Sequence, residues 1–125
     1  MNKLFVNDLV FRGRHGQTVR EVAEYQSFQL SLEITIDTLP SAKSDRLGDT
    51  YDYKQAVAIA EAVITATHSA LLEQLAERIA QHILNDPKVE RVKVMIKKIS
   101  NPEGVPGIEI TRHRSLHQGV AGFLE

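Results

Sequence analysis

Four residues of this sequence carry groups suited to acid–base chemistry or ligand binding: Glu73, Lys98, Tyr53 and Glu21. Glu73 lies in LLEQLAERIA (71–80), whose apolar residues recur at the spacing of one buried helical stripe. At about 100° per residue, Glu73 projects on the flank of that stripe and not opposite it. As an ordinary helix-start residue after a cap such as Ser69, it would gain about 0.3 to 1 kcal/mol from the helix dipole. The alternative is a carboxylate that binds a ligand.

Two lysines end a segment of alternating hydrophobicity. Val92, Val94 and Ile96 share one face of a predicted strand, and Lys98 continues that face. Lys97 belongs to the opposite, polar face. A lysine at the end of an inward-facing series either extends its ammonium to the surface or places it in a pocket as a functional cation.

Tyr53 and Glu21 have ordinary explanations when each is taken alone. Tyr53 lies in DTYDY, where a helix begins, and would normally anchor that helix with its hydroxyl at the surface. Glu21 follows Gly16 by five residues in a predicted loop, where a solvated charge is expected.

Histidine, cysteine and serine motifs give no support to a metal site or a covalent nucleophile. The sequence has five histidines: His15, His68, His82, His113 and His117. No His-x-x-x-His pair lies on a predicted helix, so we predict no metal site. The absence of cysteine excludes disulfides and thiolate chemistry, and no Gly-x-Ser-x-Gly motif is present.

Length and charge predict one domain without a strong electrostatic field. The 125 residues suffice for one core, and 15 Lys plus Arg nearly balance 16 Asp plus Glu. This balance argues against nucleic acid or a membrane surface as partner. With neither a secretory N-terminus nor an apolar run of about 18 residues, we expect a soluble, cytoplasmic protein.

Hydrophobic periodicity places these residues on a short series of elements. Alternation predicts strands, and the three-and-four spacing predicts two helices, the first capped by Asp52. The predicted strands are 3–11, 28–36, 89–98 and 108–110, and the helices begin at Asp52 and at 70, the second ending at 84. Gly, Pro, Ser and Asp predict a turn at 13–17, a loop at 39–50 and a turn at 101–107. The tail 115–125 has no period and is predicted to be a disordered end or a packing arm.

The order strand, strand, helix, helix, strand, strand predicts an α+β fold. Short turns between consecutive strands imply a four-stranded antiparallel sheet, with the two helices covering one face. We predict one domain over residues 1–114 and a separate C-terminal tail.

Together these segments resemble the dihydroneopterin aldolase family over residues 3–114. The resemblance rests on RHG followed by Glu21, Gln26 and Phe28, on SDRLGDTYDY (44–53), on LLEQLAERIA and on the lysine that ends the third strand. It implies the tunnelling fold, in which the sheets of four subunits join into a barrel. Two such rings stack into an octamer, with active sites between subunits.

The resemblance also implies an activity, which is retro-aldol cleavage of 7,8-dihydroneopterin in tetrahydrofolate biosynthesis. The products are 6-hydroxymethyl-7,8-dihydropterin and glycolaldehyde, and no metal or other cofactor is needed. By resemblance, Glu73 anchors the pterin by accepting two hydrogen bonds from its guanidine-like edge. Lys98 is the central acid/base group and Glu21 orients the side-chain hydroxyls or a water. Tyr53 of a neighbouring subunit relays a proton, and Thr50 and the backbone of Leu72 contact the ring.

Two departures from the family pattern leave alternatives open. Relatives often have proline directly after the lysine, whereas Ile99 and Ser100 follow here, and a bulge in this segment would exchange the faces of Lys97 and Lys98. Arg14 and Ala70 replace residues common in relatives, which bears on substrate preference.

The rival functions are a side-chain epimerase and a non-catalytic pterin-binding protein. The epimerase would act on dihydroneopterin or its triphosphate, and Arg12 and Arg14 could supply positive charge for the latter. Glu21, Tyr53 and Lys98 together favour an enzyme.

Overall fold

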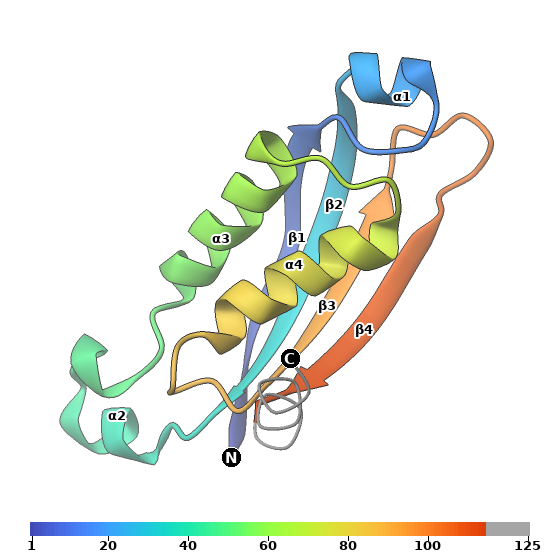
Figure 1. The fold of residues 1–125 in the computed structure, drawn as a ribbon. Coiled ribbons are helices and arrows are strands. Elements are labelled where there is room, and N and C mark those ends of the chain that lie inside the picture. The colour runs from blue at the N-terminus through green and yellow to red at the C-terminus, as the bar shows by residue number, and fades with distance from the viewer. Residues whose placement is uncertain (115–125) are drawn as a thin grey trace, which may run out of the picture.

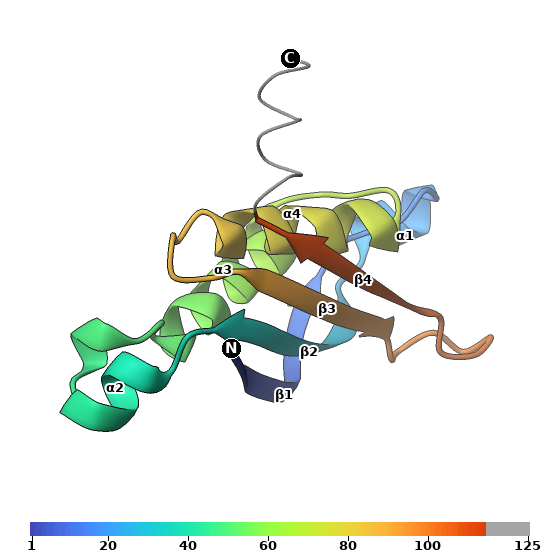
Figure 2. The same cartoon turned by 90° about the horizontal axis from the view of Figure 1, so that it is seen from below.

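A computed structural model describes residues 1–114 as one four-stranded antiparallel sheet with helices on one face (Figure 1). The strands are β1 (Asn2–Gly13), β2 (Gln26–Ile36), β3 (Arg91–Lys98) and β4 (Gly107–His113), and they lie in the order β1-β2-β3-β4. Two long helices, α3 (Tyr53–Ala66) and α4 (Leu72–Leu84), cover the sheet, and Figure 2 shows them on the same side of it. The predicted α+β class and the four-stranded antiparallel sheet with two long helices on one face are confirmed. The predicted tail, 115–125, lies outside the described residues.

Alternation in the two central strands builds the core. Every second residue of β2 from Phe28 to Ile34 is fully buried, as are Val92, Val94 and Ile96 of β3. The apolar stripe of α4, including Leu75 and Ile79, packs against this face. The predicted parity of both strands and the predicted stripe are therefore confirmed.

A bulge in β1 changes the parity of that edge strand. The β1–β2 register shifts between Val6 and Leu9, and Asp8 has a left-handed φ of 60° while its N–H donates to Ser31 Oγ at 3.0 Å. Because one face of a strand is set by alternate residues, an irregular insertion lets both Val6 and Leu9 pack towards the core.

Short helices replace irregular structure at two places where the sequence predicted loops. The 39–50 segment holds α2 (Leu39–Ser44), with proline in its first turn, and a 3₁₀ turn at Leu47–Asp49. Glu21 lies in α1 (Val19–Ala23) and not in a loop. Helices of five or six residues show too little of the 3.6-residue period to be recognised by that pattern.

The predicted cap of the second long helix is also corrected. Asp52 caps α3 as predicted, since its side chain accepts from Lys54 N–H at 3.0 Å. Helix α4 begins later than predicted, with Leu71 at the N-cap and no capping side chain. Ser69 is buried, and its main chain is held by other residues.

Within residues 1–114, none of the helices combines the length and apolar character that crossing a membrane requires.

Leu32→Ala should destabilise the fold strongly because Leu32 is fully buried at the centre of β2. We expect the free energy of unfolding to fall by about 2 to 5 kcal/mol through lost burial and the remaining cavity. Leu47→Ala is the control, since Leu47 is 64% exposed, and a change within about 0.5 kcal/mol is expected. Urea titration of both variants at one protein concentration measures the difference, and equal losses would contradict this account of the core.

Candidate active site

His15 joins the segment after β1 to the connection between α3 and α4. Its Nε2 lies 2.7 Å from the carbonyl oxygen of Ile64, and its Nδ1 accepts from the N–H of Ser69 at 3.1 Å. Because Nδ1 is the acceptor, the proton resides on Nε2 and the ring is neutral. Burial lowers the pKa of His15, which favours this neutral form. The N–H of Gly16 also donates a hydrogen bond to the carbonyl oxygen of Ser69 at 3.0 Å.

Two glycines permit this close approach. A Cβ at Gly13 would lie 2.3 Å from the carbonyl oxygen of Ile64, so any side chain there would force the segments apart. Gly16 has a φ of 142°, and a Cβ on it would lie 2.5 Å from the carboxyl carbon of Glu21. The RHG motif therefore brings the start of α1 against the start of α4.

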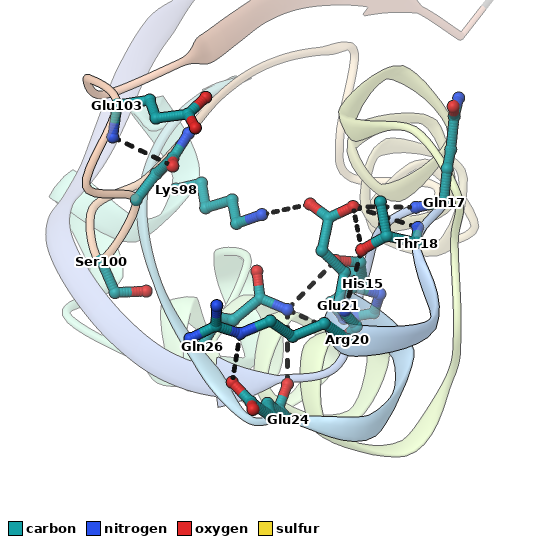
Figure 3. A network of polar contacts seen from close by, with 12 residues as sticks. His15, Gln17, Thr18, Arg20, Glu21, Glu24, Gln26, Lys98, Ser100 and Glu103 are labelled. Carbon is teal, nitrogen blue, oxygen red and sulfur yellow. Dashed lines mark hydrogen bonds and ion pairs between the residues drawn. The ribbon is translucent and has the colours of Figure 1, made fainter.

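Helix α1 presents the Glu21 carboxylate in a defined orientation. Thr18 and Glu21 form a capping box, which explains this one-turn helix between two strands. Oε1 accepts from the N–H groups of Gln17 and Thr18, both at 3.2 Å, and from Thr18 Oγ1 at 3.1 Å. Oε2 is left to face Lys98 (Figure 3).

Lys98 and Glu21 form a short ion pair, 2.5 Å from Nζ to Oε2. The hydrogen bond from Lys98, together with that from the Thr18 backbone, lowers the pKa of Glu21 to about 2. The lysine side chain is only 14% exposed. These two residues are 77 positions apart in sequence, and the fold brings them into direct contact.

The β3 register confirms the predicted separation of the two lysines. Pairing with β2 runs without a shift from Thr35 opposite Arg91 to Phe28 opposite Lys98. Lys98 thus stays on the inward face, and Lys97 is exposed on the other. No bulge precedes Lys98, so the possible exchange of faces does not occur.

A cavity of about 330 Å³ lies between α1, the start of α4 and the end of β3. Glu21 and Lys98 line one part of it, and Leu72 and Glu73 line another, with His15 and Phe28 also in the wall. Among the described residues, none forms a hydrogen bond or ion pair with the Glu73 carboxylate. The cavity is therefore lined by the Glu21 carboxylate, which is paired with the Lys98 ammonium, and by the Glu73 carboxylate, which has no partner among the described residues.

Tyr53 and Thr50 do not line this cavity. Tyr53 begins α3, the end of that helix nearer α2, whereas the cavity lies near α1 (Figure 1). Since α3 has 14 residues and a helix rises about 1.5 Å per residue, Tyr53 lies about 20 Å along the helix from its C-terminal end. Tyr53 is 52% exposed. One chain brings together Glu21, Lys98, Leu72 and Glu73, but not Tyr53 or Thr50.

Within residues 1–114, no three His, Cys, Asp or Glu side chains cluster as a metal site would require.

Comparison with known proteins identifies the family. The family model for dihydroneopterin aldolase (FolB) matches residues 4–111. The chain belongs to the dihydroneopterin aldolase family.

Individual relatives of this family match over nearly their whole length. Dihydroneopterin aldolase from Methylorubrum extorquens is 36% identical over 121 residues, which covers 91% of this chain and 92% of that one. The Streptomyces coelicolor enzyme is 34% identical over 111 residues and 89% and 93% of the two chains. The crystal structure of FolB from Vibrio cholerae has a TM-score of 0.85 at 28% identity, covering 91% of this chain and 98% of that one.

Sequence reasoning missed the contributions of His15, Thr18 and Gln17 to this family member's site. His15 was considered only as a metal ligand, although RHG contributed to the family resemblance. The available signal was Thr18 three residues before Glu21, which is the spacing of a capping box. It predicts a helix start at the position where a loop was expected.

The depressed pKa of Glu21 predicts a specific acid sensitivity. The folded form favours the carboxylate, so its stabilisation is full above the ordinary pKa of 4.5 and is lost as pH falls towards about 2. Glu21→Gln should therefore lower the free energy of unfolding more at pH 6 than at pH 2.5. Urea titrations at fixed protein concentration measure this, with exposed Glu61→Gln as control. A wild-type-to-variant difference that is equal at both pH values would exclude Glu21 as the titrating group.

Proposed function

We propose that this protein cleaves 7,8-dihydroneopterin by a retro-aldol reaction, as a lyase in tetrahydrofolate biosynthesis. The products are 6-hydroxymethyl-7,8-dihydropterin and glycolaldehyde. The observation that carries the proposal is that the Lys98–Glu21 pair and the unpaired Glu73 carboxylate line the same cavity. The chain that holds this cavity belongs to the dihydroneopterin aldolase family.

Glu73 is the proposed anchor for the pterin ring. A pterin presents an amino group and a ring N–H side by side, and one carboxylate can accept both hydrogen bonds. Such charge-assisted bonds contribute about 1.5 to 3 kcal/mol each where water is excluded. Glu73 and Leu72 both line the cavity, and the backbone of Leu72 is proposed to contact the ring as well.

Lys98 and Glu21 are proposed to handle protons at the substrate side chain. Cleavage needs a proton removed from the side-chain hydroxyl whose carbon leaves as the aldehyde. The electrons of the broken carbon–carbon bond move into the imine of the dihydropterin ring, so no metal or Schiff base is required. Lys98 takes this proton, directly or through water, as the neutral amine, which requires that its ammonium first gives up a proton to solvent. Glu21 orients the side-chain hydroxyls or the water. Positioned acid/base groups of this kind typically contribute about 10² to 10⁴ in rate.

Tyr53 and Thr50 are proposed to act from a second copy of the chain. Protonation of the enol-like intermediate needs a donor, and Tyr53 is too far along α3 to reach the cavity of its own chain. A homo-oligomer, such as a ring of four or two stacked rings, would place these residues at a neighbouring cavity. Within residues 1–114, the outer strands β1 and β4 each have one edge without a partner strand, which supports assembly through the sheets.

The reaction is tested by incubating the protein with 7,8-dihydroneopterin and separating the products by chromatography. Release of glycolaldehyde with 6-hydroxymethyl-7,8-dihydropterin supports the lyase. A side-chain epimer without glycolaldehyde would instead support the epimerase, and unchanged substrate that remains bound would support a pterin-binding protein.

The two adjacent lysines should differ sharply in this assay. Lys98→Ala should lower kcat by about 10² or more, with a smaller effect on binding of the pterin product, since a proton-transfer group acts mainly on the transition state. Lys97→Ala is the matched control because Lys97 lies on the exposed face. Steady-state kinetics and calorimetry of both variants decide the matter. Full activity of Lys98→Ala would refute the lysine mechanism.

Glu73→Gln should weaken pterin binding and leave the fold intact. The amide keeps one acceptor and loses the charge, for an expected loss of about 1.5 to 3 kcal/mol in affinity. Calorimetry with 6-hydroxymethylpterin measures the loss, and circular dichroism checks the fold. An unchanged affinity would return Glu73 to the role of a helix-start charge.

Mixing two inactive variants tests whether Tyr53 acts from another chain. Tyr53→Phe and Lys98→Ala should each be severely impaired alone. Co-refolded in equal amounts, they should regain activity, because about a quarter of shared sites would then combine both native residues. Light scattering should give an oligomer. No recovery in mixed oligomers, or a monomer at micromolar concentration, would refute the shared site.

A further inference from the structure

The 39–50 segment, which carries Thr50, is set apart from the core. None of its residues is buried, and Figures 1 and 2 show it at the opposite end of the domain from α1. The hollow of about 450 Å³ on this segment is lined only by side chains from within residues 38–50. Packing against the core therefore contributes little to the position of this segment.

One side chain from elsewhere in the chain is hydrogen-bonded to this segment. Lys88 lies in the connection between α4 and β3, and its ammonium donates to the carbonyl oxygens of Gly48 at 2.9 Å and Thr50 at 3.1 Å. Among the described residues, no other side chain from outside residues 37–50 forms a hydrogen bond or ion pair with the segment. Both carbonyls lie at the end of the 3₁₀ turn, where helical carbonyls lack partners within the helix.

The main chain that carries Lys88 is itself well fixed. The N–H of Lys88 donates to Asp86 Oδ1 at 2.9 Å. The next residue, Val89, is fully buried, and its N–H donates to the carbonyl oxygen of Asp86 at 3.0 Å. Arg114 donates to the carbonyl oxygen of Val89 at 2.7 Å. Lys88 therefore reaches the 39–50 segment from an ordered base.

Thr50 lies between two points of attachment. Lys88 binds its carbonyl oxygen, and the next residue, Tyr51, is only 2% exposed within the core. Among the described residues, none hydrogen-bonds to the Thr50 hydroxyl, so that group is available to a ligand. Loss of the Lys88 bonds would release Thr50 on one side and leave Tyr51 in the core and Tyr53 at the start of α3.

We propose that Lys88 is a positioning residue, which fixes the carbonyls of Gly48 and Thr50 and so holds the Thr50 hydroxyl where it contacts the pterin in the cavity of a neighbouring chain. Lys88 acts through Thr50 and not on the substrate. This inference rests on the proposed function, which assigns Thr50 to a shared site. It implies an effect on pterin binding more than on proton transfer, because Lys98 and Tyr53 keep their own contacts.

Calorimetry with 6-hydroxymethylpterin and steady-state kinetics of the intact oligomer test this split. Lys88→Met should weaken pterin affinity about three- to tenfold and change kcat by less than about twofold. Lys88→Arg keeps two donors and should recover most of the affinity. Lys43→Met, which alters an exposed lysine of α2 without a hydrogen-bond or ion-pair partner among the described residues, should change neither quantity. Combined with Thr50→Ala, Lys88→Met should cause little further loss, because it acts through that residue.

Mixed oligomers test whether Lys88 serves the neighbouring chain. When Tyr53→Phe and Lys98→Ala chains are mixed, each recovered site combines the cavity of a Tyr53→Phe chain with the 39–50 segment of a Lys98→Ala chain. Lys88→Met added to the Lys98→Ala chain should therefore raise the KM of the recovered activity about threefold or more. Added to the Tyr53→Phe chain, it should leave that KM unchanged. Both mixtures contain the same share of altered chains, so a general loss of stability would affect them alike.

The outcomes separate this proposal from the proposed function. Unchanged affinity of Lys88→Met, losses that add with Thr50→Ala, or an equal rise of KM in the two mixtures would overturn the role of Lys88 and leave the lyase intact. The expected affinities in a protein that releases no glycolaldehyde would support Lys88 and overturn the lyase. No recovered activity in the parent mixture of Tyr53→Phe and Lys98→Ala would overturn the shared site, and the role of Lys88 with it.

Discussion

The neutral His15 ring is the contact on which the site depends. Its two nitrogens join main-chain groups of Ile64 and Ser69, which lie 49 and 54 residues further along the chain. Through these bonds the segment that leads into α1 is held against the segment that leads into α4, and the two together form one wall of the cavity. Burial keeps the ring uncharged, and a charged ring could no longer accept the Ser69 bond. A residue that was first weighed as a metal ligand is therefore a structural link.

The two carboxylates of the cavity differ because their surroundings differ. Glu21 is surrounded by donors on both oxygens, from Thr18 and Gln17 on one side and Lys98 on the other. Those donors stabilise its charge and fix its orientation, which suits a positioning group. Glu73 projects from the first turn of α4 without a partner among the described side chains, so its acceptors are available to a ligand. The same functional group thus supports two functions within one cavity.

The prediction from sequence succeeded where a pattern is local and repeated. Alternation in β2 and β3 determines which face is buried, because successive side chains of a strand point to opposite sides. That rule alone separated Lys98 from Lys97. The apolar stripe of 71–84 likewise determined the inward face of α4 and left Glu73 on its flank. It failed for α1 and α2, which are shorter than two helical turns, and for the bulge at Asp8, where the period itself breaks.

By itself, the sequence determined the four strands, the two long helices, the buried faces of β2, β3 and α4 and, through resemblance, the family and the candidate residues. Only the tertiary structure decided that Glu21 and Lys98 touch, that Glu73 faces the same cavity and that Tyr53 does not. Contacts between residues 77 positions apart depend on how every intervening turn closes, and no local period records this. The close approach of RHG to the α3–α4 connection is of the same kind, because it requires both the absence of a side chain at Gly13 and a distant carbonyl for His15 to bind.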